Sequence, residues 1–276
     1  MDQLADLHIH TYYSDSSLSP EQVVAEANDK GLSCIAITDH DIIDGVEPAM
    51  NAAKGLNLEI IPGIELSSEI NGKDVHILGY FMDACDKSFL SRIKIMQDKR
   101  MDRMRNIIKK LEPLGIDDIL LEDVCAMTKS NCVGRPHLAK MLIEKGYCKN
   151  VKQVFNKYIG EGCPAYVPKY KQTPYEAIDL IRQCNGLAIL AHPMLTQVDS
   201  LILSLTEAGL DGLEVFYPNI SNKVIEFYKK LANKYGILVT GGSDYHGEMK
   251  SNIRMGCPSI SYEYVDAMKK RLRDRC

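Results

Sequence analysis

The chain has 276 residues, of which 45% are hydrophobic and 25% charged, a composition that excludes a disordered protein. Its formal net charge of −4 argues against a broad nucleic-acid-binding surface, which usually requires a basic domain. No stretch of about 18 apolar residues and no signal-peptide pattern occurs, and the nine cysteines include no CxxC pair, as expected of reduced thiols. We therefore expect a cytoplasmic protein without membrane contact, and no stable protein partner is evident.

Strand-like and helical segments alternate along most of the chain, as in parallel βα units. Ser19 and Thr173 each precede a proline and stand three residues before Gln or Glu, which predicts two capped helix starts. Asn71-Gly72 predicts a tight hairpin turn. Seven segments have the composition of strands: residues 4–10, 32–38, 58–66, 74–80, 186–190, 212–216 and 236–240.

The alternation stops between about residue 89 and residue 159, where the pattern indicates helices only. We therefore predict an α/β fold, a distorted (β/α)7 TIM-like barrel, formed by residues 1–86 and 163–276. Residues 87–162 would be a helical insertion that forms a substrate-reading lip. In such a barrel the chemistry lies at the C-terminal ends of the strands.

Histidines and carboxylates concentrate at these predicted strand ends. His8 and His10 are two residues apart in one strand and so point to the same side. Taken singly, each of these residues is more simply explained as a packed or capping residue. Together in a barrel, however, so many buried imidazoles and carboxylates would be costly without partners. The set comprises His8, His10, Asp15, His40, Glu65, His76, His192, Asp244 and His246.

Nine such side chains exceed the needs of one tetrahedral ion and predict two or three divalent transition metal ions. Mixed imidazole and carboxylate ligands favour Mn, Fe or Zn over Mg and Ca, and leave the choice among those three open. Clustered ions of this kind lower the pKa of a bound water towards about 7 and clamp the oxygens of a displacement at phosphorus. A phosphoester is therefore the expected substrate.

Six motifs in chain order are "DLHIHTYYSD", "AITDHD", "PGIEL", "VHILGY", "AHP" and "GGSDYHG". This set resembles the PHP (polymerase and histidinol phosphatase) superfamily. Within it, "GRPHLAKMLIEKGY" resembles the branch that hydrolyses nucleoside phosphates, including 3′,5′-nucleoside bisphosphates and short RNA 5′ ends. The resemblance implies a trinuclear site in a distorted (β/α)7 barrel, with a metal-binding side chain at all nine positions. Ser16 departs from the glycine that the family often has there, which concerns the local turn.

Arg135 and His137 in "GRPH" stand apart from the metal set. Pro136 at a first helical position would place them at a helix N-terminus, which favours an anion, so we expect them to bind phosphate. Without the resemblance, a surface arginine and a helix-start histidine would be the simpler interpretation. The basic residues of 92–110 are expected to form a solvated helix face, with a nucleotide or RNA rim as the alternative.

The residues predict a metal-dependent phosphatase, and the resemblance implies that it acts on nucleoside mono- or 3′,5′-bisphosphates, with short RNA 5′ ends as a further substrate. A metal-activated hydroxide would attack phosphorus, Arg135 would neutralise developing charge, and His192 or a metal-bound water would protonate the leaving oxygen. Asp39 is expected to orient a ligand histidine.

Three alternatives remain open. Histidinol-phosphate phosphatase shares the metal motifs, although not clearly the "GRPH" segment. An amidohydrolase also begins with HxH, but that class generally bridges its metals with a strand-end lysine where this chain has Glu65 and His192. A non-catalytic PHP module attached to a polymerase is disfavoured by the intact ligand set.

Overall fold

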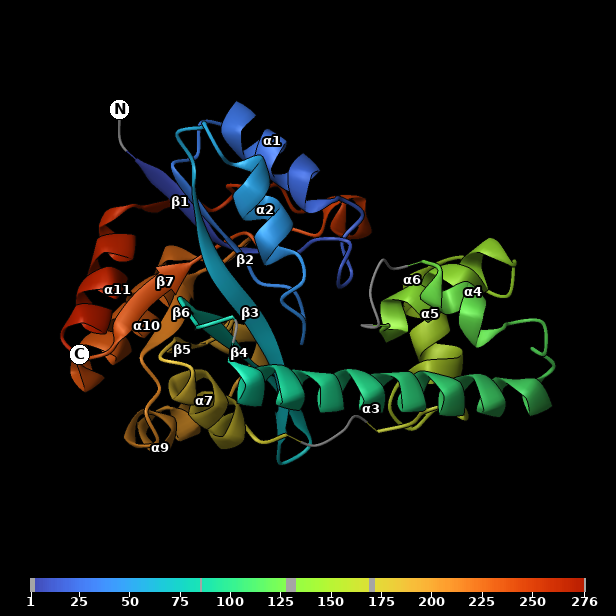
Figure 1. Ribbon diagram of the computed structural model, residues 1–276. Helices are drawn as coiled ribbons and strands as arrows, with labels where there is room; N and C mark the ends of the chain where they lie inside the picture. The colour runs from blue at the N-terminus through green and yellow to red at the C-terminus, as the bar shows by residue number, and fades with distance from the viewer. Residues whose placement is uncertain (1–2, 85, 128–132, 169–171, 276) are drawn as a thin grey trace.

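The computed structural model describes residues 3–84, 86–127, 133–168 and 172–275. Its centre is an eight-stranded sheet in the order β7-β6-β5-β4-β3-β2-β1-β8, which curls around a common interior (Figure 1). The strands are β1 (Leu4–Ile9), β2 (Cys34–Ile37), β3 (Glu59–Ile70), β4 (Lys73–Tyr80), β5 (Leu187–Leu190), β6 (Gly212–Phe216), β7 (Leu238–Gly241) and β8 (Ile260–Ser261).

The segment that follows β7, at one end of the sheet, meets β1 near the other end. The backbone N–H of His10 donates to the carbonyl of Tyr245 at 2.9 Å, and a Cβ at Gly242 would lie 2.4 Å from the backbone nitrogen of His8. Only glycine allows the backbone at position 242 to come this close to His8. This close approach nearly closes the sheet into a barrel. The predicted barrel and its seven strands are confirmed. The short β8, paired antiparallel to β1, was not predicted.

Strand β4 runs antiparallel to both of its neighbours, β3 and β5. The hairpin predicted at Asn71-Gly72 is confirmed, and both residues have positive φ (53° and 77°), as a type I′ turn requires. Because β4 is reversed, its first half lies at the same end of the barrel as the C-terminal ends of the parallel strands. His76, paired in register with Ser67, is thereby brought to that end.

Helices cover the outside of the barrel (Figure 1), and the capping boxes predicted at Ser19 and Thr173 are both present. Helix α7 contacts β3, β4 and β5, α10 contacts β6 and β7, and α11 contacts β7 and β8. Among the described residues, no helix combines the length and apolarity that crossing a membrane requires. The barrel helices are α1 (Pro20–Asp29), α2 (Val46–Ala52), α7 (Pro174–Gln183), α8 (Pro193–Thr196), α9 (Ile202–Glu207), α10 (Asn222–Tyr235) and α11 (Glu263–Arg273), with 3₁₀ turns at Asp199–Leu201 and Gly247–Lys250.

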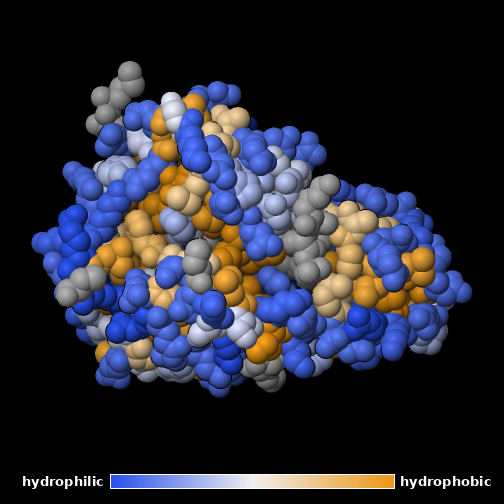
Figure 2. Space-filling model, viewed as in Figure 1, coloured by the Kyte–Doolittle hydropathy of each residue, from blue (hydrophilic) through white to orange (hydrophobic). Residues whose placement is uncertain are grey.

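The helical segment between β4 and α7 projects from the barrel as a lobe (Figure 2). Its first helix, α3 (Lys87–Leu111), is about 37 Å long at about 1.5 Å per residue and belongs to two cores. Phe89, Ile93 and Met96 pack into the barrel core, whereas Met104 and later residues pack in a second core with the rest of the lobe. The remaining elements are a 3₁₀ turn (Glu112–Leu114), α4 (Leu121–Cys125), α5 (Arg135–Glu144), α6 (Val151–Val154) and a π-helical turn (Phe155–Ile159).

Candidate metal centre

The barrel places all nine predicted metal ligands at one end. His8 and His10 come from β1 and the residue after it, His40 follows β2, and Glu65 lies in β3. The others are supplied by the loop after β1 and by β4, β5 and β7 or the residues that follow them: Asp15, His76, His192, Asp244 and His246.

Glu65 lies at the middle of the cluster and is 1% exposed. Its Oε2 lies 3.1–3.3 Å from a ring nitrogen of each of three histidines. Its Oε1 lies 2.7 Å and 3.1 Å from ring nitrogens of two others. One carboxylate therefore faces two groups of imidazoles. The rings that face Oε2 are those of His8, His10 and His40. The rings that face Oε1 are those of His76 and His192.

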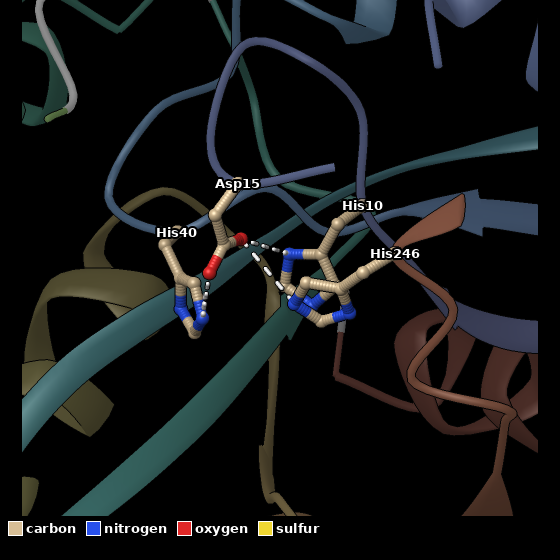
Figure 3. A group of neighbouring side chains, drawn as sticks. All are labelled: His10, Asp15, His40 and His246. Carbon is tan, nitrogen blue, oxygen red and sulfur yellow. Dashed lines mark ion pairs between the residues drawn. The ribbon is translucent and has the colours of Figure 1, made fainter. Parts of the chain in front are cut away.

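Two aspartates complete the cluster. Oδ1 of Asp244 lies 3.3 Å from Nε2 of His10 and 3.4 Å from Nδ1 of His246. Oδ1 of Asp15 lies 3.3 Å from Nε2 of His246 and 3.8 Å from Nδ1 of His10, and its Oδ2 lies 3.9 Å from Nε2 of His40. Figure 3 shows Asp15 between the His40 ring on one side and the His10 and His246 rings on the other.

The spacing of these atoms fits metal coordination. Ligands held at about 2.1 Å from one ion lie roughly 3.0–3.5 Å from one another, and many of the observed contacts fall in that range. The ligand atoms form three groups, and within each group all atoms lie within 4.8 Å of one another. Together the three groups include seven of the nine residues. Within the described part of the chain, the buried Nε2 of His8 and Nδ1 of His192 have no hydrogen-bond partner. The mixed nitrogen and oxygen donors suit divalent transition metals.

The charges of the cluster also favour a cation. Burial alone would raise the pKa values of Asp15, Glu65 and Asp244, but neighbouring imidazoles hold each well below its ordinary value. Burial alone would lower the pKa of His10, but Asp244 and Glu65 raise it to about 9, and carboxylates similarly raise that of His8. The carboxylates therefore stay ionised, and protons on His8 and His10 offset part of their charge unless metal ions do so, whereas burial lowers the pKa of His40.

Two further buried carboxylates, outside the set of nine, contact the proposed ligands or the residues next to them. Glu214 in β6 lies with Oε1 2.8 Å from Nδ1 of His8 and accepts the backbone N–H of His192 through Oε2. Asp39 accepts from the backbone N–H of Thr11 at 2.7 Å and from the Ser14 hydroxyl at 2.5 Å. The Ser14 oxygen lies 3.4 Å from Nδ1 of His10. Asp39 is therefore linked to the His10 ring through the Ser14 hydroxyl. The contact of Glu214 with His8 was not predicted from the sequence.

Asp244 is held by two groups outside the cluster. Its Oδ2 accepts from the Tyr217 hydroxyl at 2.7 Å and from Nζ of Lys250 at 2.8 Å. This leaves Oδ1 to face the histidines. The backbone of Asp244 (φ 53°) and of His192 (φ 30°) is left-handed, a strained conformation that clusters at functional sites.

A cleft of about 160 Å³ separates the metal ligands from the helical lobe. Asp15, His40 and His76 line it from the barrel, and three arginines line it from the lobe: Arg100, Arg103 and Arg135. Anions are therefore the expected occupants of the space between them.

The arginines are held by carbonyl, carboxylate and aromatic groups. Arg100 forms an ion pair with Asp41 and donates to the Ser67 hydroxyl at 2.8 Å. Arg103 donates from Nε to the Val167 carbonyl at 2.8 Å, and one of its terminal nitrogens is buried with no partner among the residues described. Burial, followed by the charges of the other two arginines, lowers the pKa of Arg103 to about 10. The sequence predicted a phosphate contact for Arg135, and it offered a nucleotide or RNA rim at residues 92–110, which include Arg100 and Arg103, only as the alternative to a solvated helix face.

Arg135 is the first residue of α5, one position before Pro136, and its guanidinium lies 5.1 Å from the centre of the Phe155 ring. His137 is only 5% exposed. Its Nδ1 accepts the backbone N–H of Gly134 at 3.0 Å, and Ser14 lines the same cleft. The structure thus brings Arg135 and His137 to the cleft, and a backbone N–H of the lobe already occupies Nδ1 of His137.

Comparison with known proteins gives consistent results. The PHP domain family model matches residues 6–274. The chain is 29% identical over 246 residues to the 3′,5′-nucleoside bisphosphate phosphatase of Chromobacterium violaceum, covering 87% of this chain and 86% of that protein. It is 32% identical over 248 residues to the 5′-3′ exoribonuclease Rnm of Escherichia coli, covering 87% and 84%. The solved structure of a candidate metal-dependent phosphoesterase from Bifidobacterium adolescentis superposes with a TM-score of 0.87 and 28% identity, covering 98% and 96% of the two chains.

Proposed function

Because the chain belongs to the PHP domain family, we propose that it is a metal-dependent phosphoesterase that hydrolyses nucleoside mono- and 3′,5′-bisphosphates and short 5′-phosphorylated RNA. One observation carries the proposal: a cleft with clustered metal ligands on one wall and three arginines on the other. A substrate with two phosphates matches both walls. The basic lobe supports this, since residues 87–162 carry 16 Lys and Arg against 9 Asp and Glu although the chain is acidic, a distribution that attracts anions.

Two or three ions of Mn, Fe or Zn, held by the nine ligands, would supply a nucleophilic water of lowered pKa and neutralise charge at phosphorus. In the hydrolysis, the water oxygen bonds to phosphorus, one P–O ester bond breaks, and the leaving oxygen takes a proton. His192, a proposed ligand that also lines the space beside the centre, is our candidate donor of that proton. Arg135 and Arg103 would hold a phosphate through the planar donor forks of their guanidinium groups.

We assign His137 a positioning role within this scheme. Its Nδ1 already accepts the backbone N–H of Gly134, and the ring lines the cleft together with Ser14 and Asp15, so it holds the start of α5 next to the loop that carries Asp15. Burial is the main cause that lowers its pKa, which makes it a neutral ring. We assign the main phosphate contact to the neighbouring arginines, whose guanidinium groups stay charged.

A phosphate-release assay with added Mn tests the function. The substrates are AMP, 3′,5′-bisphosphoadenosine, histidinol phosphate and a 5′-phosphorylated oligoribonucleotide, the last followed by release of mononucleotide. We expect turnover of the nucleotides, little release from histidinol phosphate, and loss of all activity with a chelator. A preference for histidinol phosphate, or chelator-resistant activity, would overturn the proposal.

A further inference from the structure

A second and larger space lies beside the metal centre. It forms a groove of about 500 Å³ where the start of β4 faces α8. His76 and His192, both proposed metal ligands, line it, and His76 also lines the arginine cleft. The groove and the cleft therefore both border the metal centre.

The groove differs from the cleft in size and chemistry. Pockets that bind small organic ligands typically measure about 300–1,000 Å³, a range that includes the groove but not the cleft of about 160 Å³. Leu195 lines the groove and is 59% exposed, the highest value among the large hydrophobic side chains described. An apolar side chain at a polar groove suits the flat face of a base or sugar better than a phosphate.

Polar groups surround this leucine. Lys73 lines the groove and donates from Nζ to the backbone carbonyl of Gln197 at 2.9 Å, which joins the β3–β4 hairpin to the end of α8. Asp74 and Thr196 also line the space. The groove thus combines an apolar surface with hydrogen-bonding groups, the usual combination in a site for a small organic molecule.

We propose that this groove binds the nucleotide on the far side of the scissile phosphate in an oligonucleotide substrate. The inference rests on the proposed function and deepens it. A terminal phosphate lies in the arginine cleft, the scissile phosphodiester lies at the metal centre, and the next nucleoside contacts Leu195. A nucleoside bisphosphate places one phosphate in the cleft and the other at the centre, with its nucleoside between the arginines and the metal ligands, and leaves the groove empty. The groove therefore sets how well a phosphodiester competes with a phosphomonoester.

Two substrates separate the groove from the rest of the site: 3′,5′-bisphosphoadenosine (pAp) and the 5′-phosphorylated dinucleotide pApA. Leu195→Asp places a carboxylate where the second nucleoside would lie. Since burying a leucine-sized contact is worth about 1.5–3 kcal/mol, we expect kcat/KM for pApA to fall by roughly tenfold or more. The value for pAp should stay within about twofold, as an empty groove requires. Leu195→Ser should show a smaller loss with the same selectivity.

Leu203→Asp is the matched control. Leu203 lies in α9, is 48% exposed, and should tolerate the same change without effect on either substrate. All variants are compared at equal metal content. Equal losses on pAp and pApA, unchanged kcat/KM for both, or wild-type protein that hydrolyses pAp but not pApA would overturn the inference. Wild-type protein that hydrolyses neither substrate would instead overturn the proposed function on which it rests.

Discussion

Oε1 of Glu214 lies 2.8 Å from Nδ1 of His8, and both side chains are closed to solvent. The second oxygen of the same carboxylate accepts the backbone N–H of His192 at 2.8 Å. One residue of β6 therefore fixes a ring on β1 and the turn that follows β5. A proton on Nδ1 of His8 leaves Nε2 as the atom that faces the centre, which is the tautomer a metal ligand needs.

Glu214→Gln should weaken metal binding by about 10–100-fold, the range seen when a residue that orients a metal ligand is changed. The amide keeps the size of the side chain but loses the charge that orients His8. Titration of metal into chelator-treated protein measures the effect. Glu226→Gln on the exposed face of α10 is the control, and equal affinities in the two variants would contradict this role.

Purified protein should contain two to three equivalents of transition metal per chain, because nine donors converge on adjacent positions. Chelation should lower the melting temperature as well as activity, since metal at 100 times its Kd stabilises a folded state by about 2.7 kcal/mol. Elemental analysis and a thermal melt check both. Metal-free protein with full activity would refute the assignment.

His40→Ala should remove most turnover and leave the fold intact. His40 lies 3.1 Å from Oε2 of Glu65 and is partly exposed at the cleft, so its loss perturbs the metal site more than the packing. Circular dichroism and kcat are measured together at matched metal loading. Wild-type kcat under those conditions would be inconsistent with a ligand.

His137→Ala should lower kcat/KM less than loss of Arg135 does, and should also reduce stability. The imidazole completes a cap at the start of α5, and loss of a helix cap typically costs about 1 kcal/mol. Thermal unfolding and kcat/KM on the same preparations separate the two effects. An activity loss as large as that of Arg135→Ala, with unchanged stability, would point to direct phosphate binding instead.

The sequence predicted the barrel and the convergence of nine ligands because both follow from local patterns. Side chains at the ends of neighbouring strands meet whatever the details of packing, so the placement of His8 or Asp244 needed only the strand assignment. Arg100 and Arg103 were hidden in a basic helix, because which charges face the cleft depends on how the lobe sits against the barrel. The role of Glu214 could not be predicted for a similar reason. It is a single acid in an apolar strand, and its contact with His8 forms only when the barrel closes.

In the proposed function, the metal centre and the arginine cleft act on two phosphates of one nucleotide. The most direct test is kcat/KM for wild type and Arg135→Ala on 3′,5′-bisphosphoadenosine, 3′-AMP and 5′-AMP at equal metal content, with the exposed Arg105→Ala as control. We predict a loss of roughly 10²–10³ on the bisphosphate, about 2.7–4 kcal/mol, and a smaller loss on both monophosphates. Equal losses on all three substrates, wild-type kcat/KM throughout, or a defect that follows lost metal would contradict the claim.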